Sequence, residues 1–200
     1  MQGPGTYGIV YGVTVKAFAD VSFASASITL HADGVDADTF FNAASRYWAA
    51  LPNITAAGAY AVSVLTSDTL AVPVITVPDY TSEQLDALLS PLISFFKETG
   101  VKYDYNTAHF DNFLDMWTEY IPVYSGDVGV TQSGGRFMPS SLWEDESSFN
   151  EMVKTFRNLV ESGIALNQFA ITPTLEAGGN PNNAVLPAWR TSQLMVNTVM

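Results

Sequence analysis

The chain has 200 residues and no cysteine, and its 20 Asp and Glu against 8 Lys and Arg give a formal net charge of -12. Because 48% of the residues are hydrophobic and 12% are aromatic, the composition excludes a disordered chain and predicts a globular core. The negative charge repels phosphate backbones and anionic lipids, which argues against nucleic acid and membrane surfaces as partners. The lack of cysteine excludes disulfides and thiolate chemistry.

No apolar run reaches the roughly 20 residues that cross a bilayer, so we expect a soluble chain, whose compartment the sequence leaves open. The two histidines, His31 and His109, lie far apart and show no metal-ligand spacing, so we expect no metal site.

The glycines at the start, Gly3 to Gly8, match the dinucleotide-binding pattern G-x-G-x-x-G. That pattern requires a strand before it and a helix after it. Here no strand can precede it, and the β-branched run Ile9 to Lys16 follows it. We therefore predict a glycine loop that leads into a strand, and no phosphate site at a helix N-terminus.

The first half of the chain predicts a β-α-β-β-α-β order. A strand over Val21 to Leu30 precedes a helix that begins at the acidic residues 36–38 and that we expect Pro52 to end. A hairpin, a helix opened by the capping pair Thr81 and Gln84, and a third segment of strand follow. Their ranges are 59–66 and 70–77 for the hairpin, 81–100 for the helix, and 101–105 for the strand.

The second half extends this arrangement. Apolar spacing predicts short helices near 110–117 and 149–160, and strands near 134–140 and 164–171. The strand-like run Leu194 to Met200 is either an ordinary terminal strand or an edge that continues in further sequence. We predict an α+β fold with an antiparallel sheet of about six or seven strands and helices largely on one face.

Three motifs, in this order, carry a resemblance to a known family. The run Gly3 to Val10, followed by Val13 to Lys16, resembles the G-G-x-x-F/Y-G-I/V-V-x-x-V-T-V-K signature of berberine bridge enzyme-like FAD-linked oxidoreductases, in the vanillyl-alcohol oxidase and p-cresol methylhydroxylase fold group. The run Gly135 to Leu142 is similar to the family's passage from strand to helix. The pair 178–179 and the segment 183–190 resemble its Gly-Gly pair and P-x-x-R segment.

This resemblance implies a division of labour between two domains. Residues 1–18 would be the end of an FAD-binding domain, and residues 19–200 the substrate-binding domain. Most of the FAD-binding domain and the C-terminal segment that covers the cofactor would lie outside this chain. FAD would accept a hydride from the substrate at N5, and O₂ would be the electron acceptor, while the protein positions groups and handles protons.

The resemblance also implies cofactor contacts at both ends of the chain. These residues are Gly5, Thr6, Gly8, Ile9, Val10, Trp189 and Arg190. Trp189 stands where relatives often have histidine, which puts a proton role there in doubt. Arg190 would hydrogen-bond cofactor or carbonyl oxygens, or form a structural ion pair.

The candidate catalytic residues are Tyr103, Tyr105 and Gln168. A tyrosine could bind or deprotonate a hydroxyl substrate, and its alternative is a ring packed in the core. On the strand that carries Gln168, alternation puts Asn167 and Phe169 on the opposite face, so at most one of the two amides points at the flavin.

The function we expect is a portion of an FAD-dependent oxidoreductase that oxidises a hydroxyl-bearing small molecule by hydride transfer to flavin N5. The first alternative is a non-catalytic ligand-binding or interaction module that kept the substrate-domain fold. A second is a ferredoxin-like α+β domain whose motif matches are accidental. The sequence does not name the substrate, because many chemistries share one scaffold.

Overall fold

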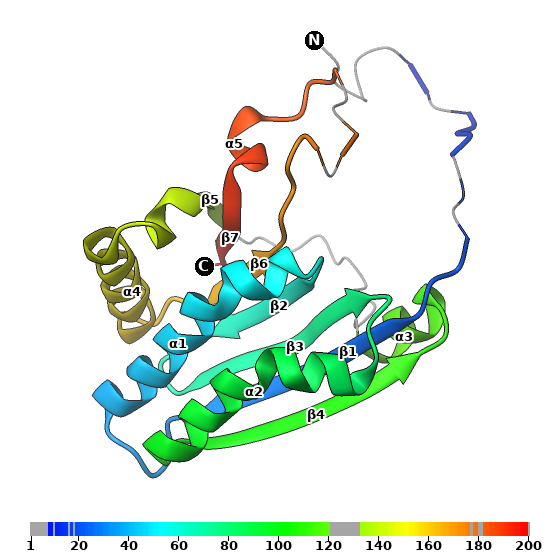
Figure 1. The fold of residues 1–200 in the computed structure, drawn as a ribbon. Helices are drawn as coiled ribbons and strands as arrows, with labels where there is room; N and C mark the ends of the chain where they lie inside the picture. The colour runs from blue at the N-terminus through cyan, green and yellow to red at the C-terminus, as the bar shows by residue number, and fades with distance from the viewer. Residues whose placement is uncertain are drawn as a thin grey trace.

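The computed structural model describes residues 8–9, 11–15, 17, 19–120, 133–176, 178–179 and 182–199. Their elements, in chain order, are β1 (Phe23–His31), α1 (Ala37–Ala56), β2 (Tyr60–Leu65), β3 (Thr69–Pro78), α2 (Ser82–Thr99), β4 (Lys102–Phe110), α3 (Phe113–Tyr120), β5 (Ser133–Pro139), the 3₁₀ helix η1 (Ser140–Trp143), α4 (Glu146–Glu161), β6 (Leu166–Ala170), α5 (Pro187–Arg190) and β7 (Ser192–Val199). Figure 1 shows their arrangement.

All seven described strands form one antiparallel sheet in the order β4-β1-β3-β2-β6-β7-β5. The first four strands and the helices α1 and α2 give the predicted β-α-β-β-α-β order, and β6, β7 and β5 extend the sheet beyond β2. The predicted α+β fold with an antiparallel sheet of six or seven strands is confirmed.

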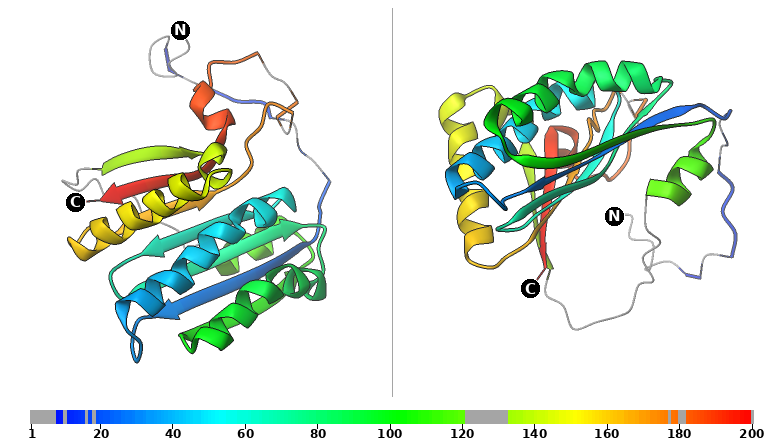
Figure 2. Two further views of the ribbon diagram at one scale, coloured as in Figure 1. Left: turned by 60° about the vertical axis from the view of Figure 1, so that its left-hand side comes forward. Right: turned by 90° about the horizontal axis from the view of Figure 1, so that it is seen from below.

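The two faces of the sheet differ. Helices α1, α2 and α4 lie on one side, whereas α3 lies on the other, as Figure 2 shows. The main core fills the space under α1, α2 and α4, with Trp48, Phe96 and Phe156 among its fully buried side chains. We call this side the helix-covered face and the opposite side, where α3 packs and where Trp189 of α5 contacts β5, the open face.

Helix α1 runs past Pro52 to Ala56, so the prediction that Pro52 ends it was wrong. A proline inside a helix leaves the carbonyl four residues earlier without its donor. That carbonyl belongs to Trp48, and it accepts a hydrogen bond of 2.7 Å from Nε1 of Trp143 in η1. A tertiary contact that the local sequence does not reveal therefore replaces the missing backbone bond.

In helix α2, a side chain from the same turn replaces the backbone donor that a proline removes. Pro91 lies inside the helix and frees the carbonyl of Ala87, which accepts a 3.0 Å hydrogen bond from the hydroxyl of Ser90. The predicted capping pair is present, since Thr81 and Gln84 exchange hydrogen bonds at the start of the helix, and Gly100 ends it with a φ of 73°.

The strand predicted over Ile9 to Lys16 was wrong for the residues of that run that the structure describes. Residues 8–9 and 11–15 belong to no strand or helix, and Ile9 and Tyr11 are fully exposed. Figure 1 shows this blue segment running away from the start of β1. A β-branched sequence favours a strand only where a partner is available. Within the described residues, no helix is long and apolar enough to cross a membrane.

The Trp143 contact predicts a specific loss of stability. The substitution Trp143→Phe removes the donor and leaves a buried carbonyl without a partner, which should lower the free energy of unfolding by about 1–3 kcal/mol in urea melts. Replacing Pro52 by Ala restores a backbone N–H that can serve the Trp48 carbonyl. Trp143→Phe should therefore cost clearly less in a Pro52→Ala background, and an equal cost in both backgrounds would rule out this role of the indole.

Candidate functional site

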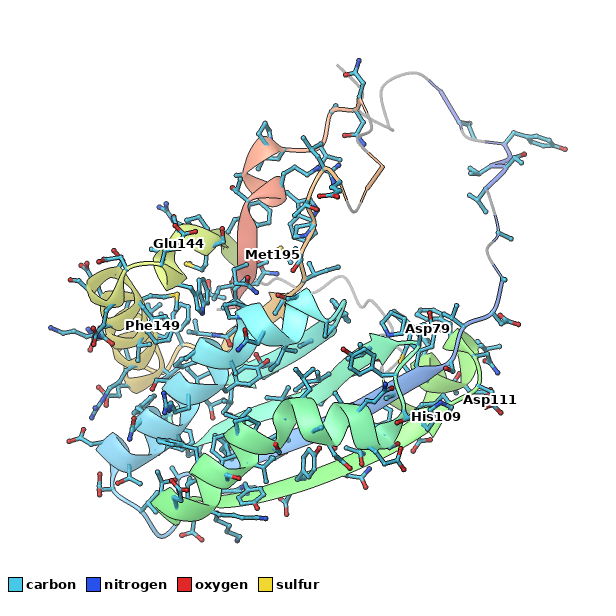
Figure 3. The ribbon with its side chains drawn as sticks, viewed as in Figure 1. Asp79, His109, Asp111, Glu144, Phe149 and Met195 are labelled. Carbon is cyan, nitrogen blue, oxygen red and sulfur yellow. The ribbon has the colours of Figure 1, made fainter. Side chains whose placement is uncertain are left out.

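The open face of β6, β7 and β5 carries a row of half-buried apolar side chains. Phe169 pairs across strands with Met195, and Met195 pairs with Phe137. The ring of Phe137 packs against Trp189 of α5 with centroids 5.4 Å apart and planes at 61°, an edge-to-face arrangement. Figure 3 shows Met195 on β7, on the part of the sheet next to α5. These four side chains form what we call the aromatic row.

Two amides lie beside the aromatic row on the same face. Asn167 of β6 pairs with Asn197 of β7, which in turn pairs with Gly135 of β5. A Cβ at Gly135 would clash with Oδ1 of Asn197 and would lie 3.3 Å from the Val196 carbonyl oxygen. Glycine at this position therefore leaves the space that the Asn197 amide occupies.

The other half of the open face holds a pocket between α3 and the sheet. Its volume is about 220 Å³, and it is lined by aromatic and aliphatic side chains with Tyr60 and Thr76 as its hydroxyl groups. Burial raises the pKa of Tyr60, so this phenol stays protonated at neutral pH. We call this cavity the α3 pocket.

The predicted cofactor-binding residues fall into three groups. Trp189 lies in the aromatic row, and Arg190 beside it donates a 3.3 Å hydrogen bond from Nη1 to the carbonyl of Pro173. That bond ties α5 to the segment after β6. Gly8 and Ile9 lie in the exposed N-terminal segment, away from the sheet. The remaining three, Gly5, Thr6 and Val10, lie outside the described residues.

Gln168 lies on the helix-covered face and is completely buried. Its Oε1 accepts hydrogen bonds of 2.9 Å from Nε1 of Trp48 and from the hydroxyl of Ser63, while its Nε2 has no partner among the described residues. Of the two neighbouring amides on β6, Asn167 is thus the one on the open face. The catalytic role predicted for Gln168 stays a prediction, and its contacts are those of a core residue.

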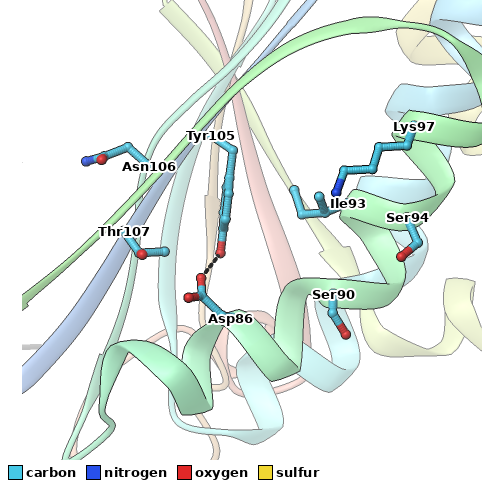
Figure 4. A pocket seen from close by; sticks show the side chains of 8 residues that line it. All are labelled: Asp86, Ser90, Ile93, Ser94, Lys97, Tyr105, Asn106 and Thr107. Carbon is cyan, nitrogen blue, oxygen red and sulfur yellow. Dashed lines mark hydrogen bonds between the residues drawn. The ribbon is translucent and has the colours of Figure 1, made fainter.

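Tyr103 and Tyr105 share a face of β4, as predicted, and this is the helix-covered face. The ring of Tyr103 packs against Phe96 of α2 at 5.8 Å between centroids. The hydroxyl of Tyr105 donates a 2.5 Å hydrogen bond to Asp86 in a groove between α2 and β4, shown in Figure 4. Burial, then the hydrogen bond and charge of Asp86, raise the pKa of Tyr105, which works against a phenolate base.

Most of the open face was not predicted from the sequence. The predicted site residues do not include Phe137, Met195, Asn197, Tyr60 or Thr76. Alternation along β7 would have placed Met195 and Asn197 on one face together, but it does not say which face lies open. Among the described residues, no group of three or more His, Cys, Asp and Glu side chains could hold a metal ion.

The crowding at Gly135 gives a test of the geometry on β5 and β7. Gly135→Ala should displace the Asn197 amide, which is the end of a flexible side chain, and should crowd the Val196 carbonyl oxygen at 3.3 Å, so the free energy of unfolding should fall by about 1 kcal/mol. Gly134→Ala is the matched control, since its nearest atom, Oγ1 of Thr198, lies at 3.4 Å. Urea melts of the two variants check this, and equal losses would contradict it.

The hydrogen bond between Tyr105 and Asp86 predicts a shifted titration. Asp86→Asn removes the negative charge, so Tyr105 should ionise at a lower pH than in the wild type, while burial still holds its pKa above the ordinary value of 10.0. Absorbance at the phenolate band, with Tyr105→Phe as the blank, measures this. Because the folded-state pKa is raised, the associated stability is present below about pH 10, the unfolded-state pKa, and is lost as pH rises through the folded pKa. Unchanged ionisation in Asp86→Asn would show that burial alone sets the pKa.

The relatives found by sequence and by structure include FAD-linked oxidoreductases and VAO-type flavoproteins. The chain is 29% identical over 195 residues to the FAD-linked oxidoreductase patO of Aspergillus clavatus, a match that covers 97% of this chain and 34% of the relative. The crystal structure of the VAO-type flavoprotein MtVAO615 from Myceliophthora thermophila matches with a TM-score of 0.76 at 21% identity, over 89% of this chain and 33% of that one. The BBE-like 1 protein of Physcomitrella patens matches with a TM-score of 0.53 at 10% identity, over 90% of this chain and 38% of that one.

No family model matches the sequence. The chain spans about a third of the length of the curated relatives it matches, and the part of the structures that it matches is likewise about a third. The aligned sequence relatives and the shared fold agree with the resemblance carried by the three motifs. In sequence and in fold, the chain is similar to FAD-linked oxidoreductases of the vanillyl-alcohol oxidase and berberine bridge enzyme-like family.

Proposed function

We propose that the chain forms the substrate-side domain of an FAD-dependent oxidoreductase and that the open face of its sheet covers the isoalloxazine ring. Residues 19–200 would make this domain, and residues 1–18 the end of the FAD-binding domain. The exposed side chains of Ile9 and Tyr11, which do not pack on the sheet, support this division.

The observation that carries the proposal is the lack of charge on the open face of four strands. The chain has 20 acidic residues, yet β2, β6, β7 and β5 contain none, and their one charged residue, Arg136, pairs with Val196 on the helix-covered face. If this face of an acidic protein contacted only water, we would expect carboxylates on it. A neutral apolar face with two amides suits a flat ring system with polar edges.

The residues present fit an isoalloxazine ring. The aromatic row offers apolar contact to the face of a ring, and Asn167 and Asn197 offer uncharged donors and acceptors to its edge. When bound, FAD supplies the redox chemistry by accepting a hydride from a hydroxyl-bearing substrate. The residues of this chain would hold the substrate against the ring and exclude water.

The candidate catalytic residues lie on the other face of the sheet from the proposed flavin contacts. The side chains of Tyr103, Tyr105 and Gln168 lie on the helix-covered face and would not touch a ring on the open face. Tyr60, in contrast, lies on the open face, and its phenol, whose pKa burial raises further, is a hydrogen-bond donor at neutral pH. In this proposal the group that accepts the substrate's hydroxyl proton lies outside these four residues, and O₂ reoxidises the cofactor.

Flavin binding tests the proposal. FAD fluorescence quenching is measured on the 200-residue chain and on a form lengthened by its upstream coding sequence, and we expect tight binding by the longer form. In that form Phe137→Ala should raise the Kd for FAD by about 5–10-fold, because it removes a ring of the aromatic row, a loss of about 1–1.4 kcal/mol.

Phe149→Ala is the matched control for this variant. Phe149 is also a half-buried member of an aromatic pair, with Trp143 at 6.0 Å, but it packs among the helices. It should lower stability without changing flavin affinity. If the longer form binds no FAD and the 200-residue chain melts cooperatively by itself, the non-catalytic binding module becomes the better account.

A further inference from the structure

We propose that the α3 pocket binds an uncharged aromatic ring that carries a carbonyl oxygen. The pocket opens on the same face as the aromatic row, with β2 lying two strands, or about 10 Å, from β7. Its assignment as a substrate subsite rests on the proposed function, whereas binding itself does not.

The walls of the pocket select a flat apolar group. Phe23 of β1 packs edge to face on Phe113 of α3, with centroids 5.8 Å apart, and Phe113 contacts Trp117 at 5.5 Å. The side chain of Met116, only 1% exposed, lies between α3 and the sheet. The cavity volume of about 220 Å³ is below the roughly 300–1,000 Å³ of whole-ligand pockets, so it fits one ring system.

The floor of the pocket offers hydrogen-bond donors. Ser25 donates from its hydroxyl to Oγ1 of Thr76 at 2.8 Å, which leaves the Thr76 proton without an acceptor among the described residues. Thr76 is 4% exposed, and a buried donor without a partner costs free energy. A carbonyl oxygen on the ligand would accept from Thr76, and the protonated hydroxyl of Tyr60 is a second donor in the same cavity.

The surrounding charge excludes an anionic ligand. Asp111, Asp115 and Glu119 lie on or beside α3, and no Lys or Arg occurs from Tyr103 to Tyr120. Asp79 follows Pro78 of the pocket wall, and Figure 3 shows Asp79 and Asp111 at the same end of the sheet. A carboxylate would enter an apolar cavity without a cationic partner, which is strongly unfavourable.

The test follows methyl signals of the 200-residue chain labelled with ¹³C-methyl methionine, with Met116→Leu assigning the Met116 signal. Acetophenone should shift the Met116 methyl saturably. Ethylbenzene, which lacks the acceptor, should bind about 5-fold more weakly, and benzoate at least about 10-fold more weakly. Met138 and Met152 line a different apolar cavity and report unspecific binding.

Two variants and a control complete the test. Thr76→Val keeps the shape of the pocket and should make acetophenone bind as weakly as ethylbenzene. Phe113→Ala should weaken both by about 5-fold, whereas Leu114→Ala, a neighbouring position on α3 that points to solvent, should change neither. The proposal is overturned if acetophenone does not shift the Met116 methyl signal, if it shifts the Met152 signal equally, or if Thr76→Val leaves its affinity unchanged. No FAD is present, so this result is independent of the flavin test.

Discussion

The indole of Trp48 joins the two halves of the sheet. Its ring is completely buried and packs on Phe156 of α4, with centroids 5.2 Å apart. Its Nε1 donates to Gln168 on β6, and its backbone carbonyl accepts from Trp143 of η1. One residue of α1 thus contacts three elements that follow in the second half of the chain, and β6, η1 and α4 have fixed positions against the first half because of it.

This contact also orients the open face. Because Gln168 must point inward to accept from Trp48 and Ser63, alternation turns Asn167 and Phe169 outward. The register then places Met195 and Asn197 beside them on β7, and Phe137 and Gly135 beside those on β5. A one-residue slip of β6 would bury the wrong set of side chains, so the buried amide serves as a register constraint.

Sequence patterns predicted elements well where the determinant is local. The capping pair Thr81 and Gln84, and the terminating Gly100, are read from neighbouring residues, and α2 has those ends. The patterns gave wrong predictions where a residue far away in the sequence determines the local structure. Pro52 stays inside α1 because Trp143, 91 positions later, supplies a donor, and the run after Gly8 forms no strand in its described residues because no partner lies beside it. The choice between Asn167 and Gln168 needed the position of Trp48.

The two faces of the sheet carry different kinds of polar side chain. Under the helices, polar side chains are engaged within the core, as Gln168 is with Trp48, and Tyr105 on the edge strand is held protonated by burial and Asp86. On β2, β6, β7 and β5 the open face carries aromatic rings, amides and hydroxyls instead, whereas His31 of β1 and Asp104 of β4 form a 2.8 Å hydrogen-bonded pair on the same face at the far edge of the sheet. The aromatic rings, amides and hydroxyls on these four strands can bind and position a neutral ring, but they do not transfer electrons. A sheet of this kind therefore needs a cofactor-bearing partner surface for redox chemistry, and specificity for the reactant is the part that its own residues can supply.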